Sequence, residues 1–353
     1  MELQTNFGGG KTHSMLALYH LFGGESLSSL RGAEELVQKE GIDGLPKVKR
    51  AVLVGTALSP AQPQVKGDGT EVNTLWGELA WQLLGKSGYD LVADADNSGV
   101  SPGSDLLREV FKKTGGCLIL IDEWIAYVRQ LYKKNSLSGG TFEANITFAQ
   151  SLTEAVRAVP NTLLVASIPA SKIEIGGDGG EVALDQLKHT FGRMESPWRP
   201  ASAEESFEIV RRRLFEDITD AKLFAMRDAV IDAYGDLYAK QAAEFPSACR
   251  EGEYRRRMKA CYPIHPEQFD RLYNEWSSLD KFQRTRGVLR LMAAVIHSLW
   301  EGNDAGLLIM PSSVPVSDPT VQPELVRYLP DSWVPVIERD IDGPNSLPLR
   351  LDR

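Results

Sequence analysis

Short apolar runs alternate with amphipathic stretches over the first 200 residues of the chain. The runs at 51–55 (AVLVG), 117–121 (CLILI) and 162–167 (TLLVAS) are apolar almost throughout. Such runs are typical of strands in a parallel sheet that is covered by helices on both faces. Helical spacing of apolar residues predicts amphipathic helices at 73–84, with Asn73 as the N-cap, at 147–158 and at 185–191.

The alternation of strands and helices continues to about position 200. Arg193–Trp198 (RMESPW) predicts a short fifth strand, and Ser202–Glu205 has the spacing of a capping box that opens a helix. Two segments rich in Pro, Gly, Ser and Asp, 59–70 and 93–103, are predicted to be loops. The pattern therefore predicts an α/β fold, with a parallel sheet and helices on both faces.

Beyond Ser202 the apolar spacing indicates helices alone, up to about Trp300. This change of pattern predicts a division into three parts. We expect an α/β domain at 1–201, an all-helical lid domain at 202–303, and the start of a further segment at 304–353.

Composition narrows the possible environments and partners. The chain has 353 residues, of which 42% are hydrophobic, and a formal net charge of −9. It can therefore bury a sizeable core, and no overall positive charge draws it to nucleic acid. Cys117, Cys249 and Cys261 lack CxxC spacing and nearby histidines, which indicates buried thiols in a reducing compartment. Without a leader or a long apolar run, the sequence predicts a cytoplasmic protein with no membrane partner.

Three consecutive glycines near the N-terminus carry the clearest chemical signal. In Thr5–Ser14 (TNFGGGKTHS), the glycines allow backbone N–H groups to converge on phosphate oxygens. Lys11 would supply a positive charge to the β- and γ-phosphates, and the Thr12 hydroxyl is suited to Mg²⁺. The helix predicted to follow directs its partial positive charge at this loop. We therefore expect contacts with ATP from Asn6, Phe7, Gly8, Gly9, Gly10, Lys11, Thr12 and His13.

Two features depart from the usual form of this loop. Position 5, where the pattern GxxxxGK[ST] has its first glycine, is Thr5. The strand that should feed the loop is reduced to the residues before Thr5, among which Leu3 is apolar. The sequence thus leads us to expect a fragment whose first strand is truncated. A flexible surface turn is the alternative interpretation of the glycines.

A phosphate-binding loop predicts a partner strand that ends in an acidic residue. The apolar run 117–121 is followed by Asp122 and Glu123. Asp122 is expected to hold the Mg²⁺ shell, and Glu123 to polarise the attacking water. The stretch between Lys11 and Asp122 leaves room for one strand and two or three helices. On its own, an Asp-Glu pair after a strand would indicate an exposed turn.

Two further polar residues are candidates for the same site. Ser167 ends the next buried strand. In an ATPase built on a phosphate-binding loop and an acidic strand, a small polar residue at that place would contact the γ-phosphate or the attacking water. A strand-terminating serine without that role is the alternative. Arg290 stands near the start of a predicted helix, from which it could reach the nucleotide. The alternative there is a solvated arginine on a helix face.

The order of these motifs resembles that of the AAA+ ATPases within the ASCE class of P-loop NTPases, in particular the branch related to origin-recognition and signal-transduction ATPases. More closely, TNFGGGKTHSMLALYHL, LIDEWIAYVRQL, ESPWRPAS, YPIHPE and FQRTRGVLRLM resemble segments of a family of large, poorly characterised prokaryotic ATPases. That family is similar to the PglY-type phage-resistance ATPases and is often encoded beside DNA methyltransferases. Because its members are much longer, the resemblance implies an ATPase core without its C-terminal domains.

The resemblance implies Mg²⁺-dependent ATP binding and hydrolysis in the cytoplasm. It places Lys11 on the phosphates, Thr12 and Asp122 on Mg²⁺, and Glu123 in the role of the catalytic carboxylate.

Arginines extend the resemblance. Arg193 resembles an arginine finger that acts on a neighbouring subunit, which implies a ring or a dimer. Arg290 resembles the sensor arginine of the lid. Arg199, Arg284 and Arg286 compete for these two roles.

Two other functions fit the same motifs. One is a switch or scaffold that binds nucleotide without hydrolysing it, and the other is a DNA-stimulated motor or remodeller, acting on DNA or with a DNA-modifying defence system. The basic runs Arg211–Arg213 and Arg255–Arg257 would favour a nucleic-acid partner. Their acidic neighbours instead favour solvated helix faces.

Overall fold

The chain forms two compact units, at Met1–Pro200 and Ala201–Arg353. The structure is a computed structural model, and it describes residues 1–5, 10–30, 32–42, 44–134, 137–169, 175–191, 197–198, 203–276, 279, 282 and 284–351.

The first unit contains a parallel sheet with the strand order β2-β5-β6-β1-β7. β5 is paired on one side with β2, where Leu53 is opposite Ile121, and on the other side with β6, where Ile121 is opposite Ala166. β1 lies between β6 and β7, with Leu3 opposite Ser167. The strands are β1 (Glu2–Thr5), β2 (Lys49–Val54), β5 (Cys117–Asp122), β6 (Thr162–Pro169) and β7 (Pro197–Trp198), and a separate hairpin joins β3 (Gln64–Val65) and β4 (Glu71–Val72).

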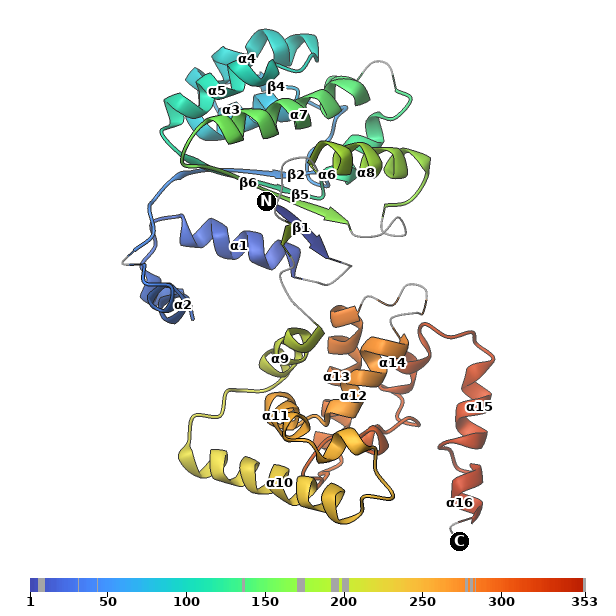
Figure 1. The fold of residues 1–353 in the computed structure, drawn as a ribbon. Helices are drawn as coiled ribbons and strands as arrows, with labels where there is room; N and C mark the ends of the chain where they lie inside the picture. The colour runs from blue at the N-terminus through green and yellow to red at the C-terminus, as the bar shows by residue number, and fades with distance from the viewer. Residues whose placement is uncertain are drawn as a thin grey trace. The chain divides into compact units, whose positions relative to one another are not determined.

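Helices cover both faces of this sheet, as the alternating pattern predicted (Figure 1). α1 packs on one face, where Met15 joins Leu3, Leu118, Leu120 and Val165 in a buried cluster. The larger core lies on the other face. The helical elements of this unit are α1 (Lys11–Leu21), η1 (Leu27–Ser29), α2 (Ala33–Lys39), α3 (Leu75–Leu84), α4 (Lys86–Ser98), α5 (Gly103–Thr114), α6 (Trp124–Val128), η2 (Arg129–Leu131), α7 (Phe142–Ala158) and α8 (Asp178–Phe191).

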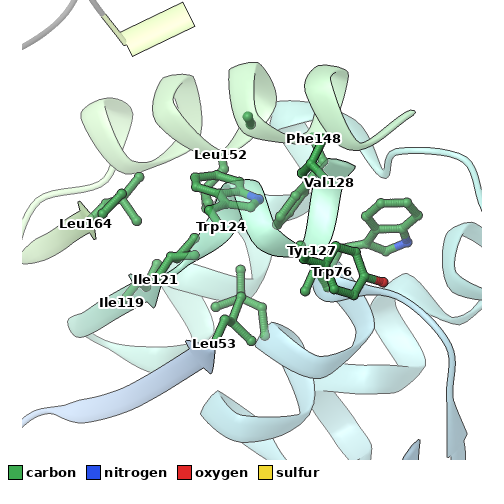
Figure 2. Packing of buried hydrophobic residues seen from close by; sticks show 14 of the residues in the cluster. Leu53, Trp76, Ile119, Ile121, Trp124, Tyr127, Val128, Phe148, Leu152 and Leu164 are labelled. Atoms are coloured by element: carbon green, nitrogen blue, oxygen red, sulfur yellow. The ribbon is translucent and has the colours of Figure 1, made fainter. Parts of the chain in front are cut away.

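The larger core is dominated by aromatic residues between the sheet and its helices. Figure 2 shows Trp124, Phe148 and Leu152 packed above the strand residues Ile119 and Ile121. Trp124 makes edge-to-face contacts with the rings of both Phe148 and Phe191. Burial of side chains this large is the main stabilising contribution, at roughly 1.5–3 kcal/mol for each fully buried large apolar group. The two core tryptophans, Trp76 and Trp124, are fully buried.

Three expectations about local structure are wrong in detail. Thr74 caps α3 by accepting a hydrogen bond from the Gly77 amide, so the cap is one residue beyond Asn73. Most of 93–103 is helical, because α4 continues to Ser98 and α5 begins at Gly103. The region between the two nucleotide motifs holds α2, α3, α4 and α5 after α1, which is more helix than the two or three predicted.

Two predicted helices begin earlier than expected. α7 starts at Phe142, because the Thr141 hydroxyl accepts from the Ala144 amide and caps it there. α8 starts at Asp178. Of the predicted fifth strand, the described part is β7, and the capping-box residue Ser202 lies outside the described residues.

The second unit is helical in its described regular structure. One buried cluster joins α9, α12, η5 and α13, with the rings of Phe207 and Phe269 stacked at 4.8 Å. A smaller cluster joins α10, η4 and α11 around Tyr238 and Met258. Its elements are α9 (Ala203–Leu214), α10 (Ala221–Lys240), η4 (Ser247–Arg250), α11 (Gly252–Cys261), α12 (Pro266–Asp270), the π-helical η5 (Arg271–Glu275), α13 (Arg284–Glu301), η7 (Pro311–Ser313), α14 (Gln322–Val326), α15 (Trp333–Asp340) and α16 (Leu347–Leu351).

The described helices include none with the length and apolar surface that spanning a lipid bilayer requires.

Candidate functional site

The glycine-rich loop leads directly into the N-terminus of α1. Gly10 is the N-cap of this helix and has the left-handed backbone (φ 79°) that glycine adopts most readily. The Ser14 hydroxyl and amide both bond to the Gly10 carbonyl, at 3.0 Å and 2.9 Å, which fixes the first turn. The positive end of the helix dipole of α1 therefore lies at Gly10, where the glycine-rich segment of the sequence ends.

Strand order brings this helix to the acidic strand. β6 separates β1 from β5 in the sheet. Asp122 nevertheless projects from the face that α1 covers, because alternate residues of a strand share a face and Leu118 and Leu120 pack with Met15 of α1. The Thr12 hydroxyl donates to Asp122 Oδ2 at 2.8 Å. The two residues expected to hold Mg²⁺ are thus in direct contact, although 110 positions separate them in the chain.

Asp122 is the centre of a compact hydrogen-bonded group. Its Oδ1 accepts from the Ser167 hydroxyl at 2.5 Å and from the Glu123 amide at 3.1 Å. The Glu123 amide also donates to Ser167 Oγ at 3.0 Å. Asp122 is 9% exposed and Ser167 is 3% exposed, so these bonds form in a largely water-excluded environment. A buried carboxylate with this many donors is held in one orientation.

Glu123 follows the strand in an unusual backbone conformation. Its φ of 54° and ψ of 36° are left-handed, which costs a non-glycine residue about 1 kcal/mol or more. It forms the N-cap of α6, and its side chain is exposed. The chain therefore turns at the carboxyl end of β5 instead of continuing the strand.

Gly55 is the residue that sequence reasoning missed. It follows β2 and donates its amide to the Asp122 carbonyl at 2.8 Å. A Cβ at this position would collide with the carbonyl oxygen of Glu123. The glycine that ends the apolar run AVLVG was the available signal, since a glycine at a strand end often marks a close backbone approach.

The other predicted loop residues are only partly described. Lys11 is half-buried and His13 is exposed on the first turn of α1. Asn6, Phe7, Gly8 and Gly9 lie outside the described residues.

The predicted arginines lie either outside the described residues or in the second unit. Arg193 and its competitor Arg199 lie outside the described residues, as does the side chain of Arg284. Arg290 belongs to the second unit, where its Nε donates to Glu324 at 3.1 Å, and Arg286 is exposed on the same helix.

The basic runs of the second unit are matched by carboxylates. Arg212 pairs with Glu208, and Arg211 lies 3.7 Å from Asp217. In the other run, the partners of Arg255 are Asp232 and Asp236, Arg256 pairs with Glu253, and Arg257 pairs with Asp270. Most of their charge is therefore neutralised within the helices.

Fold and site together define an α/β protein whose parallel sheet joins a helix N-terminus, a hydroxyl and a buried carboxylate at its carboxyl edge, followed by a helical unit. Residues 1–188 match the model of the DUF499 N-terminal domain, and residues 201–342 match that of the DUF499 second domain. The chain therefore belongs to the DUF499 family. A search among curated proteins finds no match.

Proposed function

We propose that this chain binds and hydrolyses ATP in the presence of Mg²⁺, as a P-loop module of the AAA+ type. The observation that carries the proposal is the 2.8 Å contact between the Thr12 hydroxyl and Asp122 Oδ2 at the N-terminus of α1. This contact joins the end of the glycine-rich loop to the acidic strand, and those two parts form the triphosphate and metal site of P-loop ATPases.

The donor set at this position suits Mg²⁺. A hydroxyl and a carboxylate are hard oxygen ligands, and Mg²⁺ in nucleotide sites takes one or two protein oxygens and completes its shell with water and phosphate. Thr12 and Asp122 would hold the ion. When bound, Mg²⁺ would neutralise charge on the β- and γ-phosphates.

Phosphate binding, activation of the attacking water and closure over the nucleotide would fall to residues of the chain. Backbone N–H groups at the start of α1 would bind the phosphates, with Lys11 supplying a positive charge. The exposed Glu123 carboxylate would accept a proton from the water that attacks the γ-phosphate. The helical unit would act as a lid, with Arg290 or a neighbouring arginine as its sensor, and Arg193 would act on a neighbouring subunit. A role in phage defence rests on the resemblance alone.

The test uses three versions of the chain: wild type, Glu123→Gln and Lys11→Ala. Binding of mant-ATP and release of phosphate are measured with Mg²⁺, each with and without duplex DNA. We expect wild-type turnover, and in Glu123→Gln retained binding with turnover reduced about 100-fold or more. Lys11→Ala should weaken binding itself, because a charge-assisted contact with phosphate is lost.

The possible results separate the proposal from its competitors. Failure of the wild type to bind mant-ATP, or failure of Glu123→Gln to bind it, would count against the site. Tight binding without turnover in the wild type would identify a nucleotide switch. Stimulation of turnover by duplex DNA would identify a motor or remodeller.

A further inference from the structure

We propose that Ser167 is a positioning residue that sets the Mg²⁺ carboxylate and the catalytic glutamate through one hydroxyl, and that it does not contact the γ-phosphate. The inference rests on the proposed function, and it changes the role that the sequence alone suggests for this serine.

The hydrogen-bonding capacity of a serine decides between these roles. A serine hydroxyl has one proton to donate and two lone pairs to accept with. Ser167 donates that proton to Asp122 Oδ1 at 2.5 Å, and it accepts from the Glu123 amide at 3.0 Å. A phosphate oxygen needs a donor, and the donor of Ser167 is already used. The side chain is also 3% exposed.

The same bonds fix both functional residues. Ser167 and the Glu123 amide occupy Oδ1 of Asp122, which leaves Oδ2 to Thr12, and Asp122 and Thr12 would hold the ion. The Glu123 amide is held by Ser167 and Asp122 together, which stabilises the left-handed turn at Glu123. Groups that orient a metal ligand in this way change metal affinity or activity by about 10- to 100-fold when removed.

Sheet register explains why a serine at this position can reach both residues. Ile121 is opposite Ala166, so the next residues along each strand are Asp122 and Ser167. Both side chains project from the same face as Leu118, Leu120 and Val165, which is the face that α1 covers.

The test compares wild type, Ser167→Ala and Ser167→Thr, with Ser151→Ala as the matched control. Ser151 is a buried serine of α7 in the same unit. For each variant we would measure mant-ATP binding in EDTA, the Mg²⁺ concentration that half-saturates turnover, and kcat. Far-ultraviolet circular dichroism would check folding.

We expect Ser167→Ala to bind mant-ATP in EDTA as the wild type does, to require about 10-fold more Mg²⁺, and to have a kcat lowered by about 10-fold. Ser167→Thr, which keeps the hydroxyl, should recover the low Mg²⁺ requirement, and Ser151→Ala should not differ from wild type. A lowered kcat with an unchanged Mg²⁺ requirement would overturn the inference in favour of contact with water or phosphate. An unchanged Ser167→Ala would also overturn it. Absence of binding by the wild type would instead overturn the proposed function.

Discussion

Two groups of carboxylates, one in each unit, are held in different ways. In the α/β unit, Asp122 and Asp96 are buried and accept hydrogen bonds from hydroxyls and amides. In the helical unit, Asp232, Asp236 and Glu253 lie at the surface and pair with arginines of α11. A carboxylate surrounded by neutral donors keeps its negative charge available to a cation, whereas one paired with arginine has already been neutralised.

This difference has consequences for stability as well as for chemistry. When a buried carboxylate is replaced, the neutral donors around it lose their acceptor. Several polar groups are then unsatisfied, which is costly in a low-dielectric interior. An exposed ion pair can exchange its partner for water at little cost. The contrast can be tested at Asp96 and at Asp236, and the buried histidine His265 provides a third test of burial.

Asp96 should show the largest effect on folding. It is 1% exposed and accepts from the backbone and side chains of Asn73 and Thr74 and from the Tyr89 hydroxyl at 3.1 Å. Asp96→Asn places an amide donor among these donors and removes the charge. We expect the free energy of unfolding to fall by about 3 kcal/mol, measured by urea unfolding followed through tryptophan fluorescence.

The control for this variant lies on the same helix. Asp94 is exposed, and Asp94→Asn should change the free energy of unfolding by less than about 0.5 kcal/mol. Equal unfolding midpoints for Asp96→Asn and Asp94→Asn would show that the buried hydrogen bonds of Asp96 contribute little.

Asp96 also shows where local sequence stops being informative. The apolar runs of β2, β5 and β6 predicted their strands, because continuous burial requires apolar residues at every position. The end of α4 (ADADNS) has the composition of a loop. It is helical because Val92 and Asp96 are buried against other elements, and such tertiary contacts override local propensity.

The residues of the candidate site also differ in how far local sequence predicts them. Lys11, Thr12, Asp122 and Glu123 are predicted from short local motifs, of the kind that phosphate and Mg²⁺ binding would require. The glycine that ends β2 signals a close backbone approach, but that the approach is to Glu123 depends on which strands are neighbours in the sheet. The hydrogen bonds of Ser167 to Asp122 and Glu123 depend on register for the same reason.

His265 should give an intermediate effect that depends on pH. It is 4% exposed, its Nδ1 accepts from the Glu267 amide, and its Nε2 is 2.9 Å from the Tyr238 hydroxyl. Burial lowers the pKa of His265 below its usual value, against smaller opposing effects of Glu267 and Asp270. As pH falls below about 6.5, the unfolded chain binds a proton that the folded chain does not. Stability of this region is therefore retained above that pH, and should fall by up to about 1.4 kcal/mol per pH unit below it.

Hydrogen exchange of the α10–α12 segment, corrected for intrinsic chemical rates, would measure this loss between about pH 7.5 and pH 5.5. His265→Asn is the control, because asparagine is a good N-cap and does not titrate. We expect the pH dependence of exchange to be weaker in His265→Asn than in wild type. The same dependence in both proteins would assign the effect to other groups.

The smallest effect is expected at the surface pair of Arg255 with Asp236, which are 2.8 Å apart. The side chain of Asp236 is 61% exposed, so water screens the pair and can replace it. Arg255 is the wrong residue to remove, because its guanidinium lies against Gly235, where a Cβ would collide with it, and truncation would also remove packing. Asp236→Asn removes the charge alone, and we expect it to lower the free energy of unfolding by less than about 1 kcal/mol, and by less still in high salt.

A cost close to that of Asp96→Asn would mean that neutralisation by arginine stabilises a carboxylate as strongly as burial among neutral donors. Asp96 and Asp236 would then differ in their partners but not in how much they contribute to the free energy of unfolding.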